Sequence, residues 1–196
     1  MSNMKKTVAA ILAVALMGTA LPFSGSSSPL STPLTASAEE QTTTASLSNG
    51  VITLNGNVKK EDVQQYNNNT SVTMVVCGDN VVLPTNSSGL FRYIKAKEID
   101  LSTADTSGVT DMTSMFYECS NLERLNISGF DTSHVTSMSQ MFSNCPKLKD
   151  VDLNGFDTSN VKRMDWMFNS CKSLSFIDIT GFKTNKVENM DYMFAG

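Results

Sequence analysis

The dipeptide Met-Phe returns every 26 residues along the second half of this chain. It stands at Met115-Phe116, Met141-Phe142, Met167-Phe168 and Met193-Phe194. Cysteines and leucines keep the same register, at Cys119, Cys145 and Cys171 and at Leu122, Leu148 and Leu174. A fixed period of this length is typical of a solenoid, in which each repeat packs only on its neighbours. Because a solenoid presents a long surface, binding is the expected kind of function, and catalysis needs a separate argument.

Each repeat combines two hydrophobic periods. Leu125 and Ile127 alternate with polar residues, which places both side chains on one face of a short strand. Val135 and Met138 begin a run with three- and four-residue steps, typical of a helical or 3₁₀ turn. Gly129 marks the bend between the two parts. This is the leucine-rich-repeat plan, so we expect an α/β solenoid: a right-handed stack of short parallel strands, about 4.8 Å apart, joined by short helical turns.

Residues 1–38 carry the features of a secretory signal peptide. Lys5 and Lys6 precede an apolar stretch at residues 7–21, and Ala36-Ser37-Ala38 is a small-residue cleavage site. The apolar stretch is too short for a stable membrane-spanning helix. We therefore expect a secreted, extracellular or cell-surface protein whose mature chain does not insert into the membrane.

The rest of the chain divides into three predicted segments. Residues 39–48 are a linker, and residues 49–94, which lack the repeat signature, form a small α+β cap on the first repeat. Residues 95–196 hold about four 26-residue units, the last one incomplete. We therefore expect further repeats or domains downstream of Gly196, or another chain that covers this end. The elements expected in the cap are strands at residues 51–54, 72–77 and 81–83 and a helix at residues 60–66.

The charge of the chain argues against two classes of partner. The chain has 19 acidic and 15 basic residues, and the predicted leader removes two lysines and no acid. Nucleic acids and anionic membranes are bound by clustered Lys and Arg, and no such cluster occurs here. Neither is an expected partner.

Cysteine and histidine usage indicates neither a metal site nor a catalytic centre. A cysteine that recurs in one repeat column is best explained as a small buried side chain, so we expect free thiols at Cys119, Cys145 and Cys171. A disulfide between two neighbours in the column is the alternative. No CxxC motif occurs and His134 is the only histidine, so we expect no metal, no cofactor and no catalytic residues.

Acidic residues recur in two columns of the repeats. The first could form a ladder of calcium ligands, or each carboxylate could cap its local turn, and the lysine in the fourth unit favours capping. The second lies between the strand residues and is expected to point outwards into solvent. The first column is Asp105, Asp131, Asp157 and Lys183, and the second is Asp100, Asn126, Asp152 and Asp178.

The position before Met-Phe is the candidate ligand-contact surface. It holds polar residues in two units and the aromatic residues Trp166 and Tyr192 in the others, so we expect it to be exposed. Paired aromatic residues suit protein hot spots or sugar stacking, and Lys162 and Arg163 lie nearby in sequence. The alternative is that the two rings only shield the open end of the core.

The repeated string FDTSxVxxMxxMFxxCxxL resembles the BspA-type leucine-rich-repeat surface proteins, in the variety also found in mycoplasma lipoproteins. The resemblance covers about residues 99–194 and implies an exported or surface-attached interaction protein or adhesin without catalytic residues. We therefore expect a bacterial binding or adhesion protein that contacts protein or glycan on host or neighbouring cells. The alternative is a structural spacer that displays a domain absent from this chain.

Overall fold

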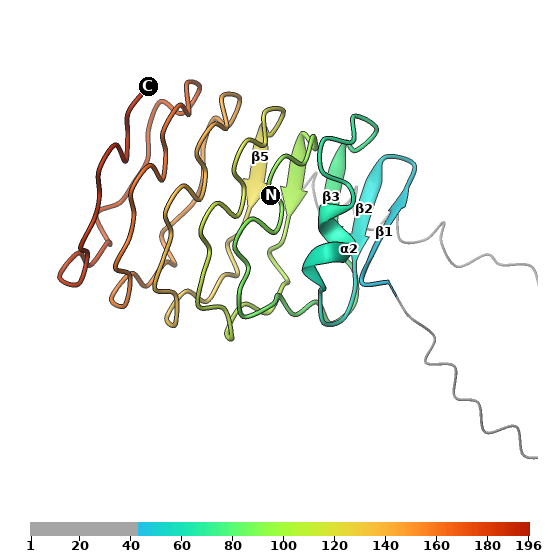
Figure 1. Cartoon of the computed structure of the whole chain (residues 1–196), viewed down its shortest axis with the longest axis horizontal. Helices are drawn as coiled ribbons and strands as arrows, with labels where there is room; N and C mark the ends of the chain where they lie inside the picture. The colour runs from blue at the N-terminus through green and yellow to red at the C-terminus, as the bar shows by residue number, and fades with distance from the viewer. Residues whose placement is uncertain (1–42) are drawn as a thin grey trace, which may run out of the picture. The chain divides into compact units, whose positions relative to one another are not determined.

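The computed structural model describes residues 43–196, so the predicted signal peptide and the first residues of the predicted linker lie outside the described part. Five strands form one sheet in the order β1-β2-β3-β4-β5, in which β1 and β2 are antiparallel and the other pairs are parallel (Figure 1). The elements are β1 (Ala45–Ser48), β2 (Val51–Leu54), α2 (Lys60–Gln64), β3 (Met74–Cys77), β4 (Glu98–Asp100) and β5 (Arg124–Asn126).

The first strand corrects the linker prediction. Residues 45–48 were expected to be linker, but they form β1, the outer strand of a hairpin with β2. The hairpin turns at Asn49 and Gly50, which both have positive φ (48° and 79°), as two-residue hairpin turns require. The expected strand at residues 81–83 is reduced to single bridges of Val82.

Successive 26-residue units lie on one another from the cap to the last unit (Figure 1). Backbone hydrogen bonds join each unit to the next, for example from Ser114 N–H to the Ser139 carbonyl (2.8 Å). A ladder of single parallel bridges follows the same direction, through Asn86, Asp111, Ser137, Arg163 and Asn189. Residues 85–94, assigned to the cap from the sequence, already belong to this stack.

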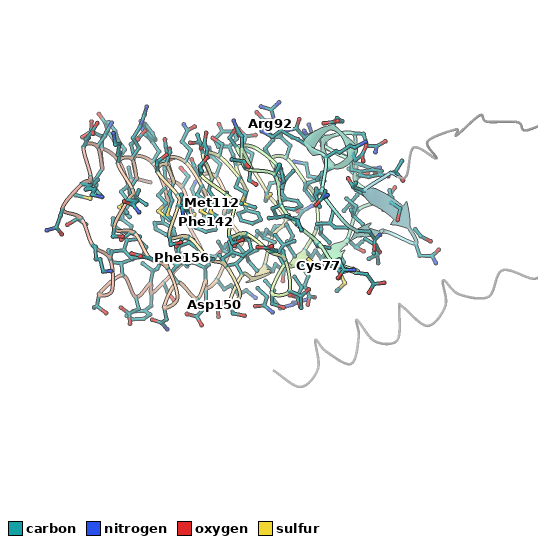
Figure 2. The ribbon with its side chains drawn as sticks, turned by 90° about the horizontal axis from the view of Figure 1, so that it is seen from below. Cys77, Arg92, Met112, Phe142, Asp150 and Phe156 are labelled. Atoms are coloured by element: carbon teal, nitrogen blue, oxygen red, sulfur yellow. The ribbon has the colours of Figure 1, made fainter. Side chains whose placement is uncertain are left out.

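Phenylalanine rings form a continuous row inside the stack. Phe116, Phe142 and Phe168 stack in parallel with centroids 5.7 and 5.3 Å apart, and Phe91 extends the row towards the cap at 5.6 Å. Figure 2 shows Phe142 and Met112 in the interior. Since each side chain contacts its own equivalents, the repeated letters form one continuous core.

Buried threonines connect neighbouring units on the other side of this core. Thr106, Thr132 and Thr158 each donate an Oγ1 hydrogen bond of 3.1 Å to a carbonyl of the next unit. Two of these oxygens also accept a backbone N–H from that unit. All three side chains are buried, and their hydroxyl groups are satisfied between units.

The prediction of a helical turn in each repeat is wrong. Among the described residues, helix occurs only in α2, and residues 139–144 and their equivalents form consecutive turns. Their backbone N–H groups alternate between carbonyls three residues back and carbonyls of the next unit, as Met141 and Phe142 show. The hydrogen bonds that a helix would keep within one turn therefore join neighbouring units instead.

The predicted strands of the last two units are also wrong. Leu125 lies in β5 as expected, but residues 151–153 and 177–179 form no strand. Arg124 on β5 forms an ion pair with Glu98 on β4, and Asp150, at the equivalent position of the next unit, forms no salt bridge among the described residues. Further along, Asp152 and Asp178 occupy equivalent positions, and like charges on adjacent strands disfavour pairing.

Candidate ligand-contact surface

The residues before Met-Phe have an unusual backbone. Ser114, Gln140, Trp166 and Tyr192 have φ between 55° and 59°, the left-handed region that most side chains avoid. A second left-handed column follows four residues later, at Tyr93, Glu118, Asn144 and Ser170. Two left-handed residues per unit turn the chain sharply on either side of Met-Phe. The sequence carries a faint signal of this, because neither column contains a β-branched residue.

Trp166 and Tyr192 are brought together by this backbone. Their ring centroids are 4.5 Å apart with an interplanar angle of 27°, and 36% and 62% of their surfaces remain exposed. In the preceding units, the Ser114 hydroxyl donates to Oε1 of Gln140 at 3.1 Å. The column is thus a ladder of contacts between units, in which one face of each aromatic ring covers the other.

Lys162 and Arg163 are paired with acids of the same chain. Arg163 donates two 3.0 Å hydrogen bonds to the buried Asp165, which also accepts a 2.8 Å bond from Ser139 Oγ. Lys162 lies 3.8 Å from Glu188 on the surface. The Arg163 guanidinium, and then Ser139, hold the pKa of Asp165 below its ordinary value. The predicted contact residues therefore separate into an aromatic pair and two compensated cations.

The first acidic column caps turns, as predicted. Asp105, Asp131 and Asp157 each accept, through Oδ1, the N–H of the serine two residues later at 2.9 to 3.0 Å. These hydrogen bonds lower the pKa of all three carboxyl groups. Lys183 takes the fourth position and lies 3.3 Å from Asp157. Within residues 43–196, no group of His, Cys, Asp and Glu is arranged to hold a metal ion.

The cysteines are free thiols, and the three in the repeats are buried as expected. The Sγ atoms of Cys119, Cys145 and Cys171 each donate to a phenylalanine carbonyl of the preceding unit at 3.1 Å. Burial raises the pKa of Cys171 to about 12. A buried thiol that remains protonated is a poor nucleophile, so this column packs the core.

A surface groove, which the sequence did not predict, lies on the side of the stack opposite Met-Phe. It has a volume of about 350 Å³ and is formed where the sheet ends beyond β5. Figure 2 shows Asp150, one of its residues, along the long edge opposite Arg92. The groove is lined by Leu125, Asp150, Val151, Asp152, Leu153, Asn154, Phe176, Ile177 and Asp178.

Comparison with known proteins identifies one family. Residues 85–196, more than half of the chain, match the model of a family described as "Mycoplasma protein of unknown function, DUF285". No curated protein matches the chain, and no solved structure matches it. In the part that the structure describes, no helix has the length and apolar character needed to cross a membrane.

Proposed function

We propose that this chain, which belongs to the family of Mycoplasma proteins of unknown function, DUF285, is a secreted or surface-displayed bacterial binding protein. Its partners are proteins or glycans on host or neighbouring cells, and it contacts them through the exposed faces of its stacked repeats. The proposal includes a right-handed, leucine-rich-repeat-like solenoid of the BspA type. It rests on the 26-residue register, which organises both the buried rows and the exposed columns.

The observation that carries this proposal is the exposed aromatic pair. Large aromatic side chains on a surface are a common source of binding energy, because they bury much area with little loss of conformational freedom. Trp166 and Tyr192 are held rigidly by mutual stacking and by a constrained backbone. Their outward edges suit a partner's apolar side chains or the rim of a sugar ring.

The test is binding of the purified protein to an array of purified extracellular-matrix proteins and mammalian glycans. Replacing Trp166 and Tyr192 together by Ala should weaken binding to the captured partner about tenfold or more. The matched control replaces Ser114 and Gln140 by Ala, which changes the same column in earlier units. Equal binding by the aromatic and control variants would refute the contact surface, and absence of any bound probe would refute the binding function.

A spacer role is the second candidate, and it too has a supporting observation. The side chains that connect units are largely satisfied by the chain itself, as the ladders of Thr132 and Asn160 illustrate. A rod held together in this way can separate two attached modules without binding anything. The two roles differ in what the array shows, since a spacer leaves every probe unbound.

A further inference from the structure

The two long sides of the stack are joined to different extents. On the Met-Phe side, backbone hydrogen bonds between units continue to the last unit, where Ser170 N–H donates to the Ala195 carbonyl at 2.7 Å. On the opposite side, which we call the leucine side (residues 122–130 and their equivalents), they stop at β5. Residues 149–152 and 175–178 form no backbone–backbone hydrogen bond.

The glycines at equivalent positions of successive units, Gly129, Gly155 and Gly181, show the same separation of the units. A Cβ atom built on Gly129 would collide with the carbonyl oxygen of Ser102 in the preceding unit. The equivalent Gly155 and Gly181 have no atom within 4 Å of that position. The units are therefore in close contact on the leucine side as far as β5, and they are separated after it.

Aromatic spacing supports this difference. The rings of Phe130 and Phe156, on the leucine side, have centroids 6.5 Å apart, whereas Phe142 and Phe168 in the interior row are at 5.3 Å. The groove lies in the opened region. It exposes backbone N–H and C=O groups that have no partner in a neighbouring unit.

Acidic and apolar side chains alternate along the groove. Asp150, Asp152 and Asp178 are exposed, and no salt bridge within residues 43–196 involves any of them. Leu125 and Phe176 line the same groove, and 77% of the Phe176 surface is exposed. Unpaired carboxylates beside exposed apolar surface are complementary to a chain that alternates basic and apolar residues.

We propose that this groove binds an extended segment of a partner protein in which Lys or Arg alternates with aliphatic residues. The segment lies along the opened units and hydrogen-bonds to the free backbone of residues 149–152, as an added β-strand does. Its basic side chains pair with Asp150, Asp152 and Asp178, and their apolar stems cover Phe176. Its aliphatic side chains, on the other face, contact Leu125 and Ile177. The site is separate from the Trp166–Tyr192 surface and does not depend on binding there.

The spacing of side chains along an extended peptide fits this groove. Successive side chains on the same face of a strand are about 6.6 Å apart, so a segment of about five residues can present three basic groups to one surface. Asp150 and Asp152 are exposed and alternate with the buried Val151 and Leu153, so both carboxylates are accessible to such a segment.

The test uses a fluorescent peptide of about eight residues that alternates Lys with Val, with binding followed by anisotropy near physiological ionic strength. The purified protein should bind it, and the double variant Asp152→Asn, Asp178→Asn should bind at least about tenfold more weakly. Asn keeps the side-chain oxygen that accepts the local turn hydrogen bond at both positions. Folding should therefore be preserved.

The control removes the same charge elsewhere. Asp105→Asn with Asp131→Asn changes two exposed turn-capping acids on another column, and it should leave peptide binding within about twofold. Phe176→Ala should also weaken binding, while a peptide of Lys alternating with Ser should bind poorly. Equal loss in the two double variants, or equal binding of the Ser peptide, would mean nonspecific attraction to an acidic protein and would overturn the proposal. Absence of binding would overturn it as well.

Backbone pairing has its own readout. Bound peptide should slow hydrogen exchange at the amides of residues 149–152, which have no backbone partner in the free protein. Amides on the Met-Phe side, such as that of Phe142, should exchange at an unchanged rate. A bound peptide that leaves residues 149–152 unprotected would refute the added-strand geometry.

Discussion

The Met-Phe side and the leucine side are built from the same repeated letters, yet only the first is bonded from end to end. On the Met-Phe side, left-handed residues such as Gln140 and Asn144 turn the backbone so that N–H groups reach the next unit. On the leucine side, adjacent backbones of the described units pair only as far as β4 and β5, where Glu98 and Arg124 also form an ion pair. Regular hydrophobic spacing thus aligns the units but does not by itself make adjacent backbones pair.

The largest expected difference between the two sides concerns their phenylalanines. Phe142→Ala should lower the free energy of unfolding by about 3–5 kcal/mol, because Phe142 is fully buried between two stacked rings. Phe156→Ala should cost less, since its stacking partner is 6.5 Å away and the leucine side is open. Urea unfolding of both variants measures the difference. Equal losses would contradict the comparison.

Glycine substitution compares the closed and open parts of the leucine side directly. Gly129→Ala should destabilise by about 1–3 kcal/mol, because the new methyl group meets the Ser102 carbonyl. The free energy of unfolding of Gly155→Ala should stay within about 0.5 kcal/mol of the wild-type value, because the new methyl group meets no atom within 4 Å. Thermal unfolding of the matched pair provides the measurement, and a destabilised Gly155→Ala variant would show that the gap is not present in solution.

The left-handed columns predict an unusual preference for glycine. Gln140→Gly should be more stable than Gln140→Val by about 1–2 kcal/mol, since valine cannot easily adopt a φ of 58°. Both variants lose the hydrogen bond from Ser114, so that bond does not contribute to the difference between them. At Lys149, which is not among the left-handed residues, valine should be at least as stable as glycine. The same order of stability at both positions would contradict the left-handed backbone conformation of Gln140.

The smallest expected effect depends on pH. The pKa of Asp165 is depressed below its ordinary 3.8 by Arg163, so its ion pair stabilises the fold above that pH and the contribution is lost as pH falls through the lower, folded-state pKa. Asp165→Asn should lower Tm by about 2–4 °C at neutral pH, and the gap to wild type should close in acid. Asp178→Asn, on the exposed leucine side, should show a smaller gap. A gap at Asp165 that persists at low pH would exclude the ion pair as its cause.

The sequence predicted features that depend on side-chain identity in register. The row of Phe116, Phe142 and Phe168, the buried thiols and the turn-capping aspartates all follow from residue type and spacing. It predicted the backbone less well. Three-residue steps in the hydrophobic pattern suit helices and consecutive turns equally, and the left-handed positions hold residues as different as Ser114 and Trp166.

The end of the sheet and the groove could not be predicted from the repeat pattern. Val151 and Leu153 have the same alternation as Leu125 and Ile127 in β5, yet they form no strand. The residues across the gap differ between units: Arg124 on β5 faces Glu98 on β4, whereas Asp150 and Asp152 have no ion-pair partner among the described residues. Among the predicted site residues, the stacking of Trp166 on Tyr192 follows from the register of the units.

The buried threonines restrict how proteins of this kind can change in length. Each hydroxyl of Thr106, Thr132 and Thr158 finds its partner 25 residues further on, inside the neighbouring unit. An insertion or deletion of a few residues within a unit would leave these buried hydroxyl groups without hydrogen-bond partners. Each unpaired hydroxyl would lower the free energy of unfolding by about 1–3 kcal/mol. Adding or removing one whole unit would leave every one of them matched. Relatives of this chain should therefore differ in length by complete 26-residue repeats.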